Sequence, residues 1–230
     1  MDDIVPALID DINESFRKEY NSSKKIKRLL EKINSPDATY VDANEYAEEV
    51  GDILKRAFIK NVSSDVLPDG KMYYNIADRV IRETLGVNYE LIADATDKVQ
   101  GALNKAARIG INPIRPKMEE QRLADLIDYA SSAEWYDDIR RRIEEALVNY
   151  SQSIVDDAVK DNADFQSKAG LHPKIIRKAE PKCCAWCRNL EGEYNYDELP
   201  QDSEVFRRHD SCRCQTYYKP IDGKKKSVWG

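Results

Sequence analysis

Apolar side chains recur at helical spacing along most of the first 165 residues. Residues three or four positions apart lie on one face of an α-helix, so such a stripe predicts an amphipathic helix. One clear stripe follows Asp42 and contains Tyr46, Val50, Ile53, Leu54, Ala57 and Phe58. A second begins near Glu134 and contains Ile139, Ile143, Ala146, Leu147, Tyr150 and Ile154. Weaker stripes predict helices over residues 4–20, 24–33, 73–85, 89–109 and 117–129.

Capping and turn residues indicate where these helices begin and end. Asp42 is followed three residues later by Glu45, a pattern that resembles a capping box and predicts a helix start at Asp42. The clearest breaks are residues 67–70 (LPDG) and 111–116 (INPIRP). A linker at Ser35-Pro36-Asp37 separates an N-terminal helical pair from the rest. We expect the apolar stripes to pack against one another.

The pattern changes in the last quarter of the chain. Residues 174–178 (KIIRK) can form a strand, and residues 214–220 (CQTYYKP) are rich in the β-branched and aromatic residues that strands favour. All five cysteines lie between or within these segments. The chain is therefore predicted to be mainly α, with a helical body over residues 1–165, a small α+β zinc-binding module over 166–220 and a basic tail over 221–230.

Charge is distributed unevenly along the chain. The 230 residues carry a net charge of −6, but residues 205–230 hold seven Lys and Arg against two acids, which gives +5 there and leaves −11 for residues 1–204. An acidic body repels phosphates, so only the C-terminal part is a candidate for binding a polyanion. The candidate residues are Arg207, Arg208 and Arg213, with Lys224 to Lys226 in the tail, and we expect Arg207 and Arg208 to be exposed.

The sequence favours a protein made in a reducing cytoplasm. The N-terminal residues have no basic region followed by an apolar run, so no signal peptide is expected. No stretch is apolar over the roughly 18 residues that a membrane span needs, so no membrane partner is expected either. In such a compartment clustered thiols hold a metal more often than they form disulfides.

The cysteines and one histidine are spaced like zinc ligands. Cys184 and Cys187 are two residues apart and can grip a metal from one tight turn, while His209, Cys212 and Cys214 offer the second half of a site. If the chain after Cys212 is extended, Cys212 and Cys214 face one side and His209 stands outside the ligand set. Alternatively, His209 and one of these two cysteines complete the site. Cys183 is read as a spare thiol.

The abundance of thiols favours a closed structural zinc site over a catalytic one. Catalytic zinc keeps one coordination position open for water, whereas four Cys and His ligands fill the shell. We find no phosphate-binding glycine loop and no nucleophile elbow in the sequence. The protein is therefore not expected to be an enzyme. Buried thiols without a metal are the remaining alternative.

Residues 149–220 resemble the C-terminal module of phage minor head proteins of the Mu F-like head morphogenesis family. The motif is Cys-x-x-Cys, then Leu-x-Gly, a variable loop and His-x-x-Cys-Arg-Cys, which falls on Cys184, Cys187, Leu190, Gly192, His209, Cys212, Arg213 and Cys214. Many members have Pro after the histidine, where this chain has Asp210. The helical residues before the module match no motif.

The resemblance implies a minor structural protein of a bacteriophage head, found in the virion after assembly in the host cytoplasm. It implies association with the portal protein or inner capsid proteins, and a role in head assembly or in DNA packaging and ejection, with no small-molecule substrate. The alternative is a zinc module that binds nucleic acid, including packaged DNA, through the arginines named above. A zinc-dependent nuclease is the weaker third hypothesis.

Overall fold

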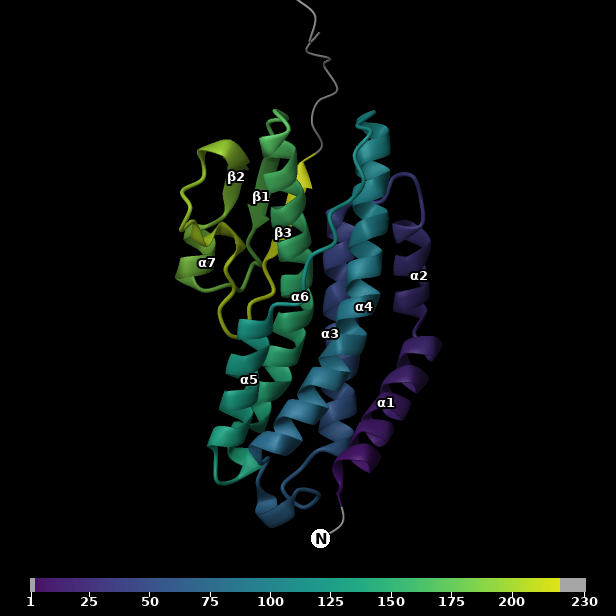
Figure 1. Cartoon of the computed structure of the whole chain (residues 1–230), viewed down its shortest axis with the longest axis vertical. Coiled ribbons are helices and arrows are strands. Elements are labelled where there is room, and N and C mark those ends of the chain that lie inside the picture. The colour runs from purple at the N-terminus through teal and green to yellow at the C-terminus, as the bar shows by residue number, and fades with distance from the viewer. Residues whose placement is uncertain (1–2, 220–230) are drawn as a thin grey trace, which may run out of the picture.

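The computed structural model describes residues 3–219 and is mainly helical, as the sequence predicts. Six helices form an elongated bundle: α1 (Val5–Ser22), α2 (Lys24–Ile33), α3 (Tyr40–Asn61), α4 (Tyr74–Ala106), α5 (Glu120–Ser132) and α6 (Tyr136–Lys168). A small C-terminal unit follows, with β1 (Lys174–Lys178), α7 (Ala185–Asn189), β2 (Gly192–Asn195) and β3 (Gln215–Lys219). Short 3-10 turns occur at η1 (Pro68–Gly70), η2 (Tyr196–Glu198) and η3 (Glu204–Phe206). Figure 1 shows this unit beside the C-terminal half of α6, away from α1 and α2.

Helix α3 begins two residues earlier than the sequence predicts. Its N-cap is Thr39, and Asp42 is the third residue of the helix, so the capping box is Thr39 with Asp42 and the expected start at Asp42 with Glu45 is wrong. The Asp42 carboxylate accepts the backbone N–H of Thr39 at 3.0 Å and its hydroxyl at 2.8 Å. Lys32 also donates to this carboxylate at 3.1 Å. The contact to Lys32 ties the start of α3 to the end of α2.

Helix α4 replaces the two separate helices expected over residues 73–85 and 89–109. Gly86 lies between those stripes, and a glycine in a helix interior costs only about 1 kcal/mol relative to alanine. The next turn is held by Asn88, which is buried and donates to the Ser151 hydroxyl on α6 at 3.0 Å. Packing along one side therefore outweighs the local weakness, and the helix continues to Ala106.

The centre of the bundle is the contact between α3 and α6. A Cβ atom added to Gly51 on α3 would lie only 2.8 Å from the Cα atom of Val148 on α6. Glycine is therefore required at this close approach of the two backbones. Buried apolar residues from α1 to α6 surround it as one continuous core. No helix within residues 3–219 is both long and apolar enough to cross a membrane.

The sheet is antiparallel with the order β2-β1-β3. Strands β1 and β3 confirm the two strands expected from the sequence, whereas β2 was not expected. On the central strand Ile175 and Arg177 are buried on one face, and Ile175 pairs with Tyr218 of β3. Ile175, Val205 and Tyr218 belong to the same apolar core as the helices. The sheet is therefore built directly onto the bundle.

Candidate metal centre

Cys184 and Cys187 are positioned by the short helix α7. Cys184 is its N-cap, and the Cys184 sulfur accepts the backbone N–H of Cys187 at 3.4 Å. This contact brings both side chains to the same side of the turn, as the two-residue spacing predicts. Cys184 is exposed, whereas Cys187 is buried beneath it. The hydrogen bond from Cys187 lowers the pKa of the Cys184 thiol and so favours its thiolate.

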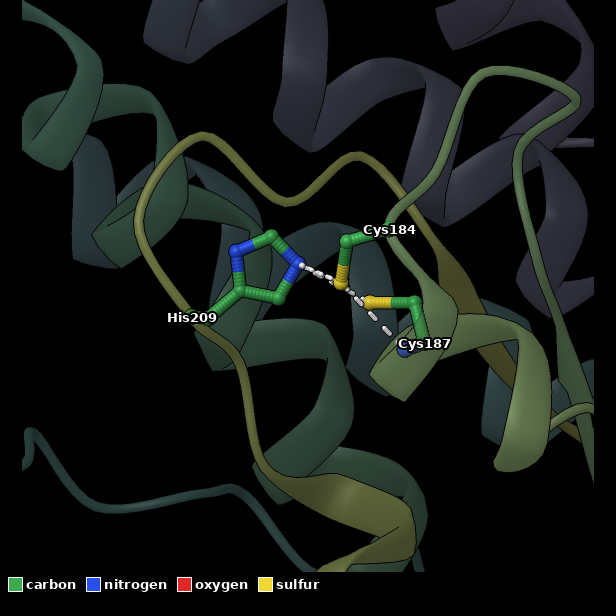
Figure 2. A group of neighbouring side chains, drawn as sticks. All are labelled: Cys184, Cys187 and His209. Atoms are coloured by element: carbon green, nitrogen blue, oxygen red, sulfur yellow. Dashed lines mark hydrogen bonds between the residues drawn. The ribbon is translucent and has the colours of Figure 1, made fainter.

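His209 reaches the same point from a loop 22 residues further along the chain. Its Nε2 atom lies 3.0 Å from the Cys187 sulfur and 3.3 Å from the Cys184 sulfur (Figure 2). Its Nδ1 atom lies 2.6 Å from the backbone carbonyl oxygen of Asp210. A carbonyl can only accept, so Nδ1 carries a proton, and in the neutral imidazole the lone pair of Nε2 faces the two sulfurs. This is the tautomer that a metal ligand needs.

Cys212 and Cys214 form the buried side of the cluster. Both are buried, and together with Cys187 they form a second group whose sulfur atoms lie within 4.8 Å of one another. The Cys187 and Cys212 sulfurs are 3.6 Å apart. Cys187 is thus shared by both groups, and the structure brings together all five residues that the sequence singles out. Cys183 is in neither group and only packs against the second.

The distances fit a metal ion better than a disulfide. A disulfide joins two sulfurs at about 2.05 Å, far shorter than the separation of Cys187 and Cys212. Zinc holds sulfur at about 2.3 Å, so two sulfurs on one tetrahedral ion are about 3.8 Å apart, and a sulfur and a nitrogen about 3.6 Å apart. These Cys and His groups could therefore hold a metal ion.

Burial favours cation binding by the two inner thiols, Cys187 and Cys214. Removal from water raises the pKa of Cys187 and of Cys214 above the ordinary value for a thiol. Without a cation these sulfurs stay protonated, and they become anionic ligands only when a metal compensates their charge. The buried half of the cluster is thus suited to a resident ion.

Arg208 occupies a different place from the one the sequence suggests. Its side chain is 0% exposed, and its partner Asp156 on α6 is 1% exposed, so the expectation that Arg208 is a surface residue is wrong. Arg208 Nε lies 2.5 Å from Asp156 Oδ2, and its Nη2 lies 3.2 Å from Oδ1. Its Nη1 also reaches the carbonyl oxygen of Cys212 at 3.5 Å. This arginine anchors the loop over residues 205–214, which carries His209, Cys212 and Cys214 and is called the ligand loop below, to the bundle. Arg208 is therefore not available to nucleic acid.

The other two arginines are also engaged within the protein. Arg213 lies between two candidate ligands, and its Nη2 is 2.8 Å from Glu145 Oε2 on α6, while its Nε is 3.5 Å from Glu48 Oε1 on α3. Arg207 is 70% exposed at its side chain and pairs with Glu204 at 2.9 Å. Of the three predicted arginines, only Arg207 presents its guanidinium to solvent. Lys224 to Lys226 lie outside the described residues.

Sequence reasoning missed Asp156, which lies two positions after Ile154, the last residue of the predicted stripe. A carboxylate next to the buried residues of that stripe is the signal that could have indicated a buried cation partner.

Comparison with models of known protein families, with curated proteins and with solved structures finds no match for this chain. The resemblance to phage minor head proteins therefore rests on the motif residues alone.

Proposed function

We propose that the C-terminal unit is a small module cross-linked by a zinc ion. The observation that carries this proposal is the convergence of two segments on the Cys187 sulfur, which one group of potential ligands shares with Cys184 and His209 and a second shares with Cys212 and Cys214. Thiolate and imidazole together are the ligand chemistry that selects zinc among the common divalent ions. When bound, the ion would cross-link α7 to the loop that precedes β3.

We further propose that the protein is a minor structural component of a bacteriophage head that docks to the portal or inner capsid. The motif resemblance supports this role. It is also supported by the rigid attachment of the module, because the Arg208 pair with Asp156 and the Arg213 pair with Glu145 fix both flanks of Cys212 to α6. Both metal groups within residues 3–219 consist of Cys and His alone, which favours a closed, structural ion over a catalytic one.

The nucleic-acid alternative has less support. Arg208 is buried and Arg213 is ion-paired with acids of α3 and α6, so neither can contribute freely to phosphate binding. Arg207 and the tail lysines remain as candidates. Phosphate contacts impose a steep dependence of affinity on salt, since each one releases counterions. Binding to portal protein should depend on salt much less.

Co-purification with the portal protein of the same phage tests the docking role. The wild type and Cys183→Ser should bind the portal protein and enter assembled heads, whereas Cys187→Ser should lose both, because it removes the sulfur shared by the two metal groups. Cys183→Ser is the matched control, as it alters a thiol next to the cluster that belongs to neither group. Normal assembly with Cys187→Ser would contradict the proposal.

Arg207→Ala separates the two functional hypotheses. A docking surface that includes Arg207 would lose portal binding, because exposed arginines often contribute strongly to protein interfaces. A nucleic-acid module would keep portal binding and lose affinity for DNA with a shallower salt dependence. DNA binding that changes while portal binding does not would therefore favour the second hypothesis.

A further inference from the structure

Arg177 is a fully buried charge on the central strand of the sheet. Its side chain is 0% exposed and its guanidinium lies beneath the metal-ligand loop. Nη1 donates to the Val205 carbonyl and to the Thr216 hydroxyl, both at 2.9 Å. Nη2 donates to the Arg207 carbonyl at 3.1 Å and lies 3.7 Å from the sulfur of Cys212.

The guanidinium lacks the carboxylate partner that a buried arginine normally has. Within residues 3–219 its contacts are to neutral oxygens and to the Cys212 sulfur, and its Nε atom has no hydrogen-bond partner. Arg208, on the same loop, shows the usual arrangement with its charge against Asp156. Arginine stays charged in proteins, and an unpaired charge in the interior is strongly unfavourable. An anion must therefore stand near Arg177, and the Cys212 sulfur is the group in that position.

We infer that Arg177 is the counter-charge of the metal centre and that it acts through Cys212. This rests on the proposed zinc site. Three thiolates and a neutral imidazole around a divalent ion carry −1, which Arg177 cancels, whereas four thiolates carry −2. Cys212 lies in the group that also contains Cys187 and Cys214, so its contact to Arg177 marks Cys212 as one of the ligands.

The Arg177 guanidinium also connects the ligand loop to the sheet. Val205 and Arg207 precede His209 on the ligand loop, and Thr216 on β3 follows Cys214, so Arg177 on β1 holds the ligand loop at both ends. A bound ion would hold the Cys212 sulfur as an anionic ligand beside the Arg177 guanidinium. Arg177 is thus a positioning residue whose benefit depends on the bound metal.

Zinc affinity of three arginine variants tests this role. Arg177→Met should weaken zinc binding about 10- to 100-fold, the range found when groups that support metal ligands are removed. Arg177→Lys keeps the positive charge but lacks the guanidinium, and it should lose less zinc affinity than Arg177→Met. Arg207→Met is the control and should bind within about 2-fold of the wild type, because it removes an exposed arginine from the same loop. The measurement is competition for zinc with a chromophoric chelator.

The results separate this inference from the zinc proposal. A wild-type protein that binds no zinc overturns the zinc site itself. A wild type that binds zinc, with a folded Arg177→Met variant of unchanged affinity, overturns only the role of Arg177. If Arg177→Met does not fold, Arg177→Gln takes its place beside Arg177→Lys. Equal zinc affinity of those two variants overturns the inference, since they differ in charge.

The ligand set is tested with cobalt in place of zinc. Charge-transfer absorption from thiolate to cobalt reports how many sulfurs are bound. Cys212→Ser should lose intensity and bind cobalt more weakly, whereas Cys183→Ser, a thiol outside both groups, should keep the wild-type intensity. Unchanged intensity in the Cys212 variant overturns the assignment of Cys212 as a ligand.

Discussion

The guanidinium of Arg208 meets the carboxylate of Asp156 in the interior between the ligand loop and α6, with Nε 2.5 Å from Oδ2 and both side chains almost fully buried. His209 follows Arg208 directly in the chain, so this pair fixes the start of the segment that carries the second half of the metal site. The position of a candidate ligand is therefore determined by a charge pair 52 residues apart in sequence.

Breaking that pair should destabilise the fold strongly. Arg208→Ala leaves Asp156 as an uncompensated buried charge, and loss of one partner of a buried ion pair costs about 3–5 kcal/mol. Arg207→Ala, the neighbouring exposed arginine, should change stability by less than about 1 kcal/mol. Urea unfolding of both variants measures the difference. Equal stabilities would show that the Arg208 pair is not a structural anchor.

Removal of the ion should unfold the C-terminal unit while most helix remains. The ligands join two segments of a small unit, whereas most residues of the apolar core belong to helices α1 to α6. Far-ultraviolet circular dichroism should therefore change little when a chelator is added. Trp186 fluorescence should change clearly, because its indole ring lies edge-on to His209 with the ring centroids 5.7 Å apart.

That fluorescence signal needs a background without the other two tryptophans. Trp135 and Trp229 are replaced with Phe, so that emission comes from Trp186 alone. A chelator that leaves this emission and the protease resistance of the C-terminal unit unchanged would contradict a structural role for the ion.

Zinc content should distinguish Cys187, which both groups share, from Cys183, which belongs to neither. Purified Cys187→Ser should lose most of its zinc, because Cys187 belongs to both groups of potential ligands. Cys183→Ser should keep about one zinc per chain and the wild-type melting temperature. Elemental analysis of both proteins after gel filtration gives the answer. Zinc retained in the Cys187 variant would mean that the ion is held elsewhere.

Asp157 should make the protein less stable as pH rises through the acidic range. Burial, and then the nearby charge of Asp156, raise the pKa of Asp157 from 3.8 to about 7. The folded chain therefore holds this proton more tightly than the unfolded chain. The stabilisation is complete below about pH 4 and is lost as pH approaches 7, by up to about 4 kcal/mol for a shift of this size.

Asp157→Asn removes that titration and is the matched test. The variant should be more stable than the wild type near pH 7, and the difference should shrink towards pH 4. Urea unfolding of both proteins at several pH values, with zinc in excess, measures it. Subtracting the two curves cancels the pH dependence of metal binding, which both share. A difference that is constant with pH would refute the raised pKa.

Elements whose evidence is local follow from the sequence alone. The helix over residues 24–33 and the strand over 174–178 have the predicted bounds, because their periodicity and flanking residues decide them without reference to the rest of the chain. The same holds for the candidate ligands. A pair such as Cys184 and Cys187 two residues apart already defines one half of a metal site.

Contacts between residues distant in sequence determine which side chains are buried and which groups they face. Periodicity does not distinguish an exposed arginine from one that meets Asp156 across the bundle, so Arg208 was expected at the surface. Arg177 lies on the same face of its strand as the buried Ile175, but its contact with Cys212 depends on how β1 packs beneath the ligand loop. The continuity of α4 and the pairing of β2 likewise come from contacts distant in sequence. The spacing of cysteines and histidine in the sequence identifies the candidate ligands, whereas the charged groups around them are placed by packing between distant segments.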